Sequence, residues 1–337
     1  MNQLNYISDS KIIDDLVNKY TNILIIQADN PDADSLASSL ALEEIFTKLN
    51  KSVYQYCAVV MPEYLHYIDG WDRVSTDFPS NFELVIFVDV STYTLLEKMI
   101  SYQYIQRVKV KPTIVLDHHK EVKNKIDFAK VIINQDQLSS TGELIYRIAT
   151  DLNWPINIQS GTAIMASILG DTQGLSNQLT KPETYRLIAD LIDLGVDRLQ
   201  LDEKRKQYSL MPIEIFRYKS ELINRTEFFY DNSIALICLN QNDISKYSSK
   251  YNQGPLIQSD ILQVKNVKVS IIIKAYKDRH LTASIRCNYN YAIAANLAVE
   301  FGGGGHAYAS GINLKNINVN EFKKNIIEKA YQLLNKL

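Results

Sequence analysis

Cysteine is scarce in this sequence. The 337 residues include only Cys57, Cys238 and Cys287, which lie far apart and form no CxxC pair. An odd number of isolated cysteines argues against a disulfide framework, and each lies in an apolar or mixed run where a free thiol behaves as a small hydrophobic group. The cysteine usage therefore predicts a reducing compartment.

Long apolar runs are also missing. No segment approaches the roughly 18 consecutive apolar residues that a membrane span needs. Residues 1–20 contain acidic side chains and lack the apolar core of a signal peptide. We therefore expect a cytoplasmic protein that has no membrane partner.

A surplus of basic residues is the third absence. Lys and Arg number 36 against 38 Asp and Glu, so the formal net charge is −2. A protein that holds a long duplex by its phosphates usually carries a clear positive surplus. We expect no long duplex nucleic acid as a partner, although a local basic site within a neutral protein is compatible with this charge.

The chain is long enough for two domains, and its 46% of hydrophobic residues suffices for real cores. Up to Gly195, short apolar runs of strand length alternate with helical spacing. This alternation is typical of an α/β domain with a doubly wound, mostly parallel sheet. The expected strands are 22–28, 53–60, 84–90, 113–116 and 130–133, and the expected helices are 8–20, 35–49, 94–100, 141–151, 160–169 and 181–194.

The pattern changes after Gly195, where charged residues at helical spacing form a connecting stretch. Strands are expected over 233–239, 267–276 and 282–286, and helices over 291–301 and 319–337. We therefore predict a catalytic domain over 1–195, a helical linker over 196–224 and a smaller, substrate-binding α/β domain over 225–337.

Acidic residues follow three of the predicted strands. Asp32 and Asp34 come after the first strand, Asp89 ends the third, and Asp117-His118-His119 ends the fourth. The carboxyl ends of parallel strands meet at one edge of a sheet, which is where ligands bind in open α/β folds. Asp171 follows an apolar helix and is a fourth acid for the same edge. Each piece alone is compatible with a helix cap or a solvated turn, so the prediction of a site depends on the set.

Crowded carboxylates with an imidazole are suited to binding metal ions. Without a cation, four carboxylates in one place repel one another. A pair of divalent cations also activates a water molecule and neutralises an anionic phosphate ester. Carboxylate and imidazole ligands favour Mn²⁺, with Mg²⁺ or Co²⁺ as substitutes. The sequence therefore predicts two metal ions per chain and a phosphoesterase.

This series of motifs resembles the DHH phosphoesterase superfamily, which includes nanoRNase/pAp phosphatases, cyclic-di-AMP phosphodiesterases, single-strand exonucleases and family II pyrophosphatases. The resemblance covers most of the chain. The matching segments are Asn-Pro-Asp-Ala-Asp-Ser at 30–35, Val-Asp-Val at 88–90, Asp-His-His at 117–119, Ser-Ser-Thr at 139–141, Gly-Asp-Thr-Gln-Gly at 170–174, and Gly-Gly-Gly-Gly-His at 302–306 with Ala-Ser-Gly at 309–311. The last two segments resemble the DHH-associated C-terminal domain.

The resemblance implies a role for each residue of the N-terminal site. Asp32 and Asp89 would bind one metal, and Asp89 would be shared with a second metal. His119 would face the substrate phosphate, and Asp117 would orient a histidine. The ligands implied for the second metal are Asp34, Asp89, His118 and Asp171.

The resemblance also implies a phosphate-binding site in the C-terminal domain. Consecutive glycines can turn backbone N–H groups toward an anion without steric cost. His306 can donate to a phosphate, and Arg286, at the end of an expected strand, can grasp one with two hydrogen bonds. The implied substrate-binding residues are Arg286, Gly303, Gly304, Gly305 and His306.

One position departs from the family pattern. Many members have a histidine ligand four residues before the first aspartate, where this chain has Ala28. Asp29 is our candidate for the missing ligand, with Gln27 and Asn30 as alternatives. A nucleotide-binding sensor with weakened catalysis on the same fold is the alternative function that Ala28 motivates.

The expected function is hydrolysis of short oligonucleotides, linear dinucleotides or pAp-like nucleotides. A single-strand-specific exonuclease is a second alternative, although the chain lacks an extra nucleic-acid-binding domain and a basic surplus. The sequence leaves open the physiological substrate, RNA or DNA preference, the direction of attack, the native metal and the oligomeric state, a homodimer included.

Overall fold

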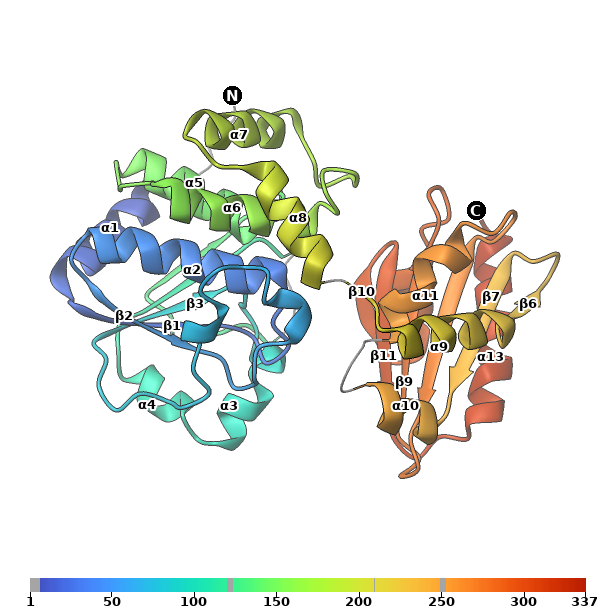
Figure 1. The fold of residues 1–337 in the computed structure, drawn as a ribbon. Coiled ribbons are helices and arrows are strands. Elements are labelled where there is room, and N and C mark those ends of the chain that lie inside the picture. Colours follow the sequence, from blue (N-terminus) through green and yellow to red (C-terminus); the bar gives the residue numbers. More distant parts are fainter. Residues whose placement is uncertain (1–6, 120–123, 209, 249–252) are drawn as a thin grey trace. The chain divides into compact units, whose positions relative to one another are not determined.

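The computed structural model describes residues 7–119, 124–208, 210–248 and 253–337. It divides into two compact units, Met1–Leu210 and Met211–Leu337 (Figure 1). Helix α8 (Arg198–Tyr208) belongs to the first unit and helix α9 (Ile213–Asn224) to the second. The stretch expected as a linker is therefore divided between the two units.

The first unit contains a five-stranded sheet in which all strands are parallel. Along the sheet the order is β2-β1-β3-β4-β5, so the chain changes direction across the sheet at β1 and β3. The strands are β1 (Asn22–Ile26), β2 (Ser52–Tyr56), β3 (Leu84–Val88), β4 (Thr113–Asp117) and β5 (Val131–Asn134). This topology confirms the predicted doubly wound parallel sheet.

Helices cover both faces of this sheet (Figure 1). The side chains of β3 and β4 are buried along their whole length, as expected for strands enclosed on two sides. On one face lie α1 (Ile7–Lys19), α2 (Ala33–Lys48) and α5 (Thr141–Asp151); on the other lie α3 (Glu97–Ser101) and α4 (Ile105–Lys109). Helices α6 (Ile158–Asp171), α7 (Pro182–Asp193) and α8 pack outside α2.

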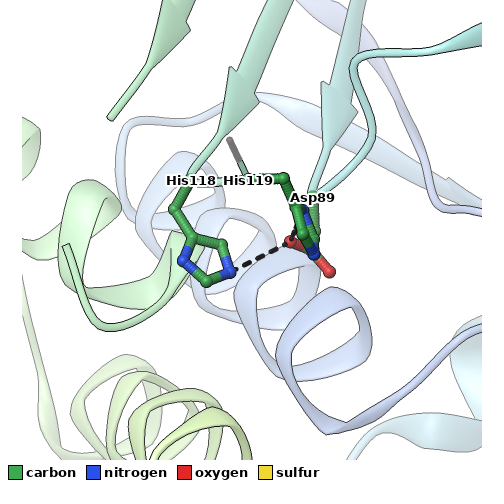
Figure 2. Close-up of side chains that lie close together, drawn as sticks. All are labelled: Asp89, His118 and His119. Carbon is green, nitrogen blue, oxygen red and sulfur yellow. Dashed lines mark ion pairs between the residues drawn. The ribbon is translucent and has the colours of Figure 1, made fainter. Parts of the chain in front are cut away.

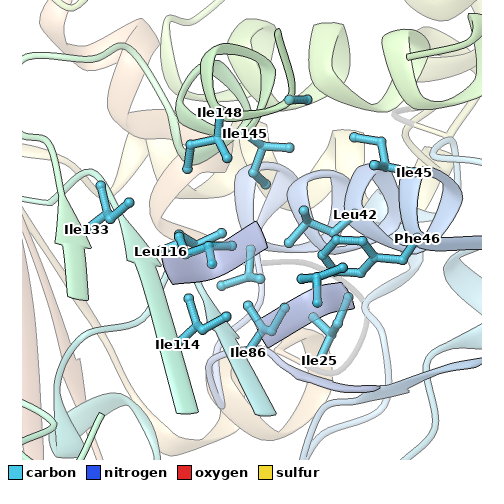
Figure 3. Close-up of a cluster of buried hydrophobic side chains, with 14 of the residues drawn as sticks. Ile25, Leu42, Ile45, Phe46, Ile86, Ile114, Leu116, Ile133, Ile145 and Ile148 are labelled. Carbon is cyan, nitrogen blue, oxygen red and sulfur yellow. The ribbon is translucent and has the colours of Figure 1, made fainter. Parts of the chain in front are cut away.

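The main core lies between the sheet and helices α2 and α5 (Figure 3). Ile86 and Ile114 from neighbouring strands are fully buried there. Phe46 of α2 packs edge-on against Trp154, with ring centroids 5.4 Å apart. This apolar layer fixes α2 and α5 over the sheet, and both helices begin at the edge where the strands end.

The second unit contains a six-stranded sheet of order β10-β11-β9-β8-β7-β6, antiparallel except for the β7–β8 pair. Helices α12 (Ala294–Glu300) and α13 (Val319–Leu334) cover one face; α9 and α11 (Gln253–Leu262) pack on the other. The remaining elements are β6 (Glu227–Phe229), β7 (Ile234–Leu239), α10 (Gln241–Tyr247), β8 (Val269–Ala275), β9 (Leu281–Cys287), β10 (Gly304–His306) and β11 (Ala309–Leu314).

The sequence pattern missed several elements of the second unit. Strands β10 and β11 are rich in glycine and small polar residues, which have low intrinsic strand propensity, and cross-strand pairing forms them nonetheless. In the first unit, the expected helix over 94–100 is a 3₁₀ turn, η3 (Tyr93–Leu95), followed by the short α3. None of the helices within the described ranges is long and apolar enough to cross a membrane.

Candidate metal centre

The start of helix α2 supplies the first two carboxylates. Asp32 is its N-cap residue: Oδ1 accepts a hydrogen bond from Ser35 N at 3.0 Å, and Ser35 Oγ accepts one from Asp32 N at 3.0 Å. Asp34 lies in the first turn and is fully buried. The helix-cap interpretation of Asp32 therefore holds for one of its carboxylate oxygens, while its position still brings it to the sheet edge.

The buried carboxylate of Asp34 is held by three surrounding elements. Its Oδ1 accepts hydrogen bonds from Ser38 Oγ at 2.8 Å and from Ser167 Oγ at 2.5 Å. Its Oδ2 accepts one from Thr141 N at 2.8 Å, at the start of α5. Because a buried carboxylate without such partners is costly, these donors stabilise Asp34 in place and fix the direction of its oxygens.

Asp89 follows β3 in a left-handed backbone conformation, with φ of 59°. This conformation is uncommon for a residue with a side chain, and such strained residues occur mostly at functional sites. The backbone N–H of Asp89 donates to Leu116 O at 2.8 Å, and its Oδ1 accepts from Thr141 Oγ1 at 3.0 Å. The turn thus directs a buried carboxylate toward the start of α5 rather than onward along the strand.

His118 lies among three carboxylates. Its Nε2 is 2.9 Å from Asp171 Oδ2, 3.3 Å from Asp34 Oδ2 and 3.8 Å from Asp89 Oδ1. This buried nitrogen nevertheless makes no well-formed hydrogen bond with any described group. The Nδ1 atom is 3.4 Å from Leu138 O, and donation to that carbonyl leaves the Nε2 lone pair for the carboxylate side.

His119 and Asp117 form a hydrogen-bonded pair beside His118. Oδ1 of Asp117 accepts from His119 Nδ1 at 2.8 Å and from the backbone N–H of His118 at 2.8 Å. Although burial opposes it, the hydrogen bond from His119 lowers the pKa of Asp117 to about 2. Figure 2 shows both imidazoles next to Asp89, whose Oδ1 is 3.5 Å from His119 Nδ1.

Asp171 reaches the cluster because α6 packs closely on α2. A Cβ atom at Gly170 would lie 2.7 Å from Ala33 Cβ, so only glycine allows this approach of the two helices. Asp171 ends α6 and is partly exposed. The close contact between the helices thus brings Asp171 beside Asp34, 137 positions earlier in the chain.

In the absence of a cation, the negative charges of the cluster repel one another. Burial and the neighbouring Asp34 raise the pKa of Asp89 well above its usual value and that of Asp171 to about 6. Burial alone would lower the pKa of His118, but Asp171 and Asp34 outweigh it and raise that pKa to about 9. These shifts have a common cause, an excess of negative charge at the site.

The arrangement fits a divalent cation. Two groups of ligand atoms lie close enough together to share an ion: Asp34, His118 and Asp171 form one, and Asp89, His118 and His119 form the other. The buried, unpartnered Nε2 of His118 points to a missing partner, and carboxylate with imidazole suits Mn²⁺. Asp32 belongs to neither group. Desolvation of its carboxyl by the surrounding groups, together with the nearby Asp34 charge, raises its pKa.

The two residues at the departure from the family pattern do not join these groups. Ala28 is buried among apolar side chains. Oδ2 of Asp29 accepts from Lys98 N at 2.6 Å, at the start of α3, and its Oδ1 is buried without a hydrogen-bond partner among the described residues. One oxygen of Asp29 is therefore held by α3, and its role as a replacement ligand stays a prediction.

The phosphate-binding residues expected from the C-terminal motif lie on the second unit. Arg286 of β9 pairs with Ala309 of β11, which pairs with His306 of β10, so the three side chains share one row and one sheet face. Arg286 and His306 are both exposed. This face is opposite the one covered by α12 and α13.

The three glycines of that motif have different structural constraints. A Cβ atom at Gly303 would overlap Gly311 O, and one at Gly305 would lie 2.6 Å from Ser310 Cα. Gly304 has open space around it. Close backbone packing thus explains Gly303 and Gly305 without any ligand, whereas packing does not require a glycine at position 304.

Sequence reasoning missed the residues that hold the ligands. Ser38 lies four residues after Asp34 and Ser167 four before Asp171, so each shares a helix face with an acid of the cluster. Thr141 was part of a recognised motif but had no assigned role. The helical spacing was the available signal, but the contact of Ser167 with Asp34 depends on the packing of α6 against α2.

Residues 22–170, within the first unit, match the family model described as "DHH family, N-terminal domain". An uncharacterized protein, the MG371 homolog of Mycoplasma pneumoniae, is 24% identical over 90% of both chains. The bifunctional oligoribonuclease and PAP phosphatase NrnA of Thermus thermophilus is 22% identical, over 89% of this chain and 86% of that protein. The cyclic-di-AMP phosphodiesterase GdpP of Bacillus subtilis is 23% identical, over 93% of this chain and only 48% of GdpP.

Solved structures share the fold. An exopolyphosphatase-related protein from Bacteroides fragilis superposes with a TM-score of 0.83 over 100% of this chain and 98% of that protein, at 21% identity. RecJ of Thermus thermophilus, in a structure with Mn²⁺, has a TM-score of 0.57 at 11% identity, over 98% of this chain and 55% of RecJ. These matches confirm the expected α/β fold.

Metal binding should stabilise the first unit. We expect EDTA-treated protein to melt about 5–10 °C higher after Mn²⁺ is added to roughly 100 times its dissociation constant, because the cation relieves carboxylate repulsion. Differential scanning fluorimetry measures this shift. The Asp89→Asn variant should show little shift, and an unchanged melting temperature of the wild type at millimolar Mn²⁺ would contradict the assignment.

The serine that holds Asp34 should tune metal affinity. Ser167→Ala removes the 2.5 Å hydrogen bond to Asp34 Oδ1, and we expect Mn²⁺ affinity to fall about 10- to 100-fold. Isothermal titration calorimetry provides the measurement. Ser101→Ala is the matched control, because that exposed hydroxyl donates to a backbone carbonyl in α3. Equal affinities in both variants would remove Ser167 from the ligand support.

Proposed function

We propose that this protein is a metal-dependent phosphoesterase that hydrolyses short oligonucleotides, linear dinucleotides or pAp-like nucleotides. The observation that carries the proposal is the convergence of Asp34, Asp89, His118 and Asp171 at the topological switch point of a doubly wound sheet. The similarity to NrnA over most of both chains supports the substrate class.

The carboxylates and the imidazole of the site are suited to binding divalent cations. Asp32, Asp34, Asp89, His118 and Asp171 are the residues that would hold two cations, with Asp89 shared. When bound, divalent cations neutralise the phosphoryl oxygens and lower the pKa of water to give a nucleophile at neutral pH. Mn²⁺ is the metal that we propose, with Mg²⁺ or Co²⁺ as substitutes.

His119 is the residue that we assign to the substrate phosphate. Its Nδ1 is held by Asp117 at 2.8 Å, so Nε2 is the ring nitrogen that we assign to a ligand. Burial alone would lower the pKa of His119, but the hydrogen bond to Asp117 and that residue's charge raise it overall. A more readily protonated imidazole can donate a charge-assisted hydrogen bond to a phosphoryl oxygen.

The second unit carries residues that can bind a phosphate. Arg286 can form two hydrogen bonds to a phosphate, and His306 in the same row can form another. The backbone at Gly303, Gly304 and Gly305 lies next to this row and can approach a ligand without side-chain obstruction. Such an arrangement favours a small substrate with a terminal phosphate over a long strand.

A nucleotide sensor is the alternative that the structure gives a reason for. Ala28 is 5% exposed and is packed among apolar residues, so it offers no ligand to the first metal. An assay panel of pAp, pApA, cyclic dinucleotides and two- to five-residue RNA and DNA, each with Mn²⁺, separates the two functions. Hydrolysis of any member supports the enzyme, whereas tight binding of a nucleotide without product supports the sensor.

The shared ligand should be indispensable for turnover. Asp89→Asn keeps the shape of the side chain but removes its charge, and we expect activity to fall by on the order of a hundredfold or more. Initial rates on the best substrate of the panel measure the effect. Asp193→Asn, at an exposed position of α7, should keep full activity. Near-normal turnover of the Asp89 variant would refute the shared-ligand assignment.

Arg286 should contribute to substrate binding and leave the metal centre intact. Arg286→Ala should raise KM about 10- to 100-fold, the range for losing a hydrogen-bonded charge, with unchanged Mn²⁺ affinity. Arg279→Ala is the control, because Arg279 is exposed in the turn before β9, at the opposite end of that strand. An unchanged KM in the Arg286 variant would exclude this residue from the site.

A further inference from the structure

A tyrosine stands at the same sheet edge as the metal centre. Strand β2 is the parallel neighbour of β1, so the segment after β2 leaves the sheet beside the loop that carries Asp32. The short 3₁₀ turn η1 (Glu63–Leu65) lies in that segment. The hydroxyl of Tyr64 donates to Pro31 O at 3.2 Å, which places this side chain against the residue that directly precedes Asp32.

The ring of Tyr64 is exposed, and well-packed neighbouring residues hold its backbone in place. Tyr64 is 53% exposed, whereas its neighbours Leu65 and Tyr67 are buried in the core under α2 and α6. His66, which matched no motif, stacks on Trp71 with ring centroids 3.4 Å apart and an interplanar angle of 8°. Its Nε2 is 3.1 Å from Met61 O. These contacts hold the segment in place before any ligand arrives.

The hydroxyl of Tyr64 keeps its proton at neutral pH. Burial of the oxygen and the nearby Asp32 charge raise its pKa. The phenol therefore remains a donor to Pro31 O, and the ring stays anchored at one end with an apolar face open. Aromatic rings of this kind bind any nucleobase by stacking, because every base has a π-face.

We propose that Tyr64 is a substrate-binding residue: a base of the substrate stacks on its ring while the phosphate lies at the cluster of Asp34, Asp89, His118 and Asp171. This inference rests on the proposed function and narrows its substrate class. A ring at this place favours nucleotides over phosphate compounds without a base. Stacking also predicts little preference among the bases.

The kinetic test compares two variants and two substrates. Tyr64→Ala should raise KM for pApA about tenfold, while kcat and Mn²⁺ affinity stay near wild type; Tyr64→Phe should keep the wild-type KM. For an analogue of pApA without its bases, neither substitution should change KM. Tyr54→Ala is the control, because that ring is 37% exposed and its hydroxyl also donates to a backbone carbonyl, Asp77 O at 3.0 Å.

A second measurement reports stacking directly and does not depend on turnover. A dinucleotide containing 2-aminopurine should lose fluorescence on binding to wild type and Tyr64→Phe in a stopped-flow mixing experiment, and should keep it with Tyr64→Ala. If the Tyr64→Ala variant quenched the fluorescence as strongly as the wild type and had the same KM, that result would overturn the proposal. So would a Tyr64→Phe variant as impaired as Tyr64→Ala with weakened Mn²⁺ binding, because the hydroxyl would then act only by holding the Asp32 loop. If the wild type quenched the fluorescence but did not hydrolyse the dinucleotide, the proposed function would be wrong, whereas the role of Tyr64 in stacking would stand.

Discussion

The structure of the first unit depends on one electrostatic constraint: several carboxylates are buried at one point and need positive charge there. Asp34 and Asp89 are buried within reach of the same imidazole nitrogen, and Asp171 lies 2.9 Å from it. Serine hydroxyls and backbone N–H groups compensate part of the negative charge. The remaining excess is what makes the place suited to cations, and cations in turn are what an anionic phosphate ester needs.

Two unusual local features of the fold bring these charges together: a left-handed residue and a close contact between helices. The left-handed turn at Asp89 redirects a carboxylate at the end of β3. The glycine at 170 allows α6 to approach α2, and α6 carries Ser167 and Asp171 to Asp34. β1 and β3 flank the point where the sheet changes direction, which is where ligands bind in open α/β sheets.

Much of the first unit was predictable because its signals are local. Buried parallel strands such as Leu84–Val88 are continuous apolar runs, and acids directly after them predict a shared edge. What the sequence could not give was contact through space: Ser167 supports an acid 133 positions away, and Tyr64 reaches Pro31 from another strand's loop. In the second unit, pairing overrides the weak strand propensity of Gly304–His306. The hydrogen bond that Asp29 accepts from α3 likewise depends on tertiary packing.

The central claim is that distant residues share a pair of cations, and anomalous diffraction from crystals grown with Mn²⁺ tests it most directly. The account predicts two manganese peaks roughly 3.5–4 Å apart, with Asp89 between them and Asp34, His118 and Asp171 around one of them. Crystals with saturating Mn²⁺ that show no manganese beside His118, or show it only at other surfaces, would contradict the account.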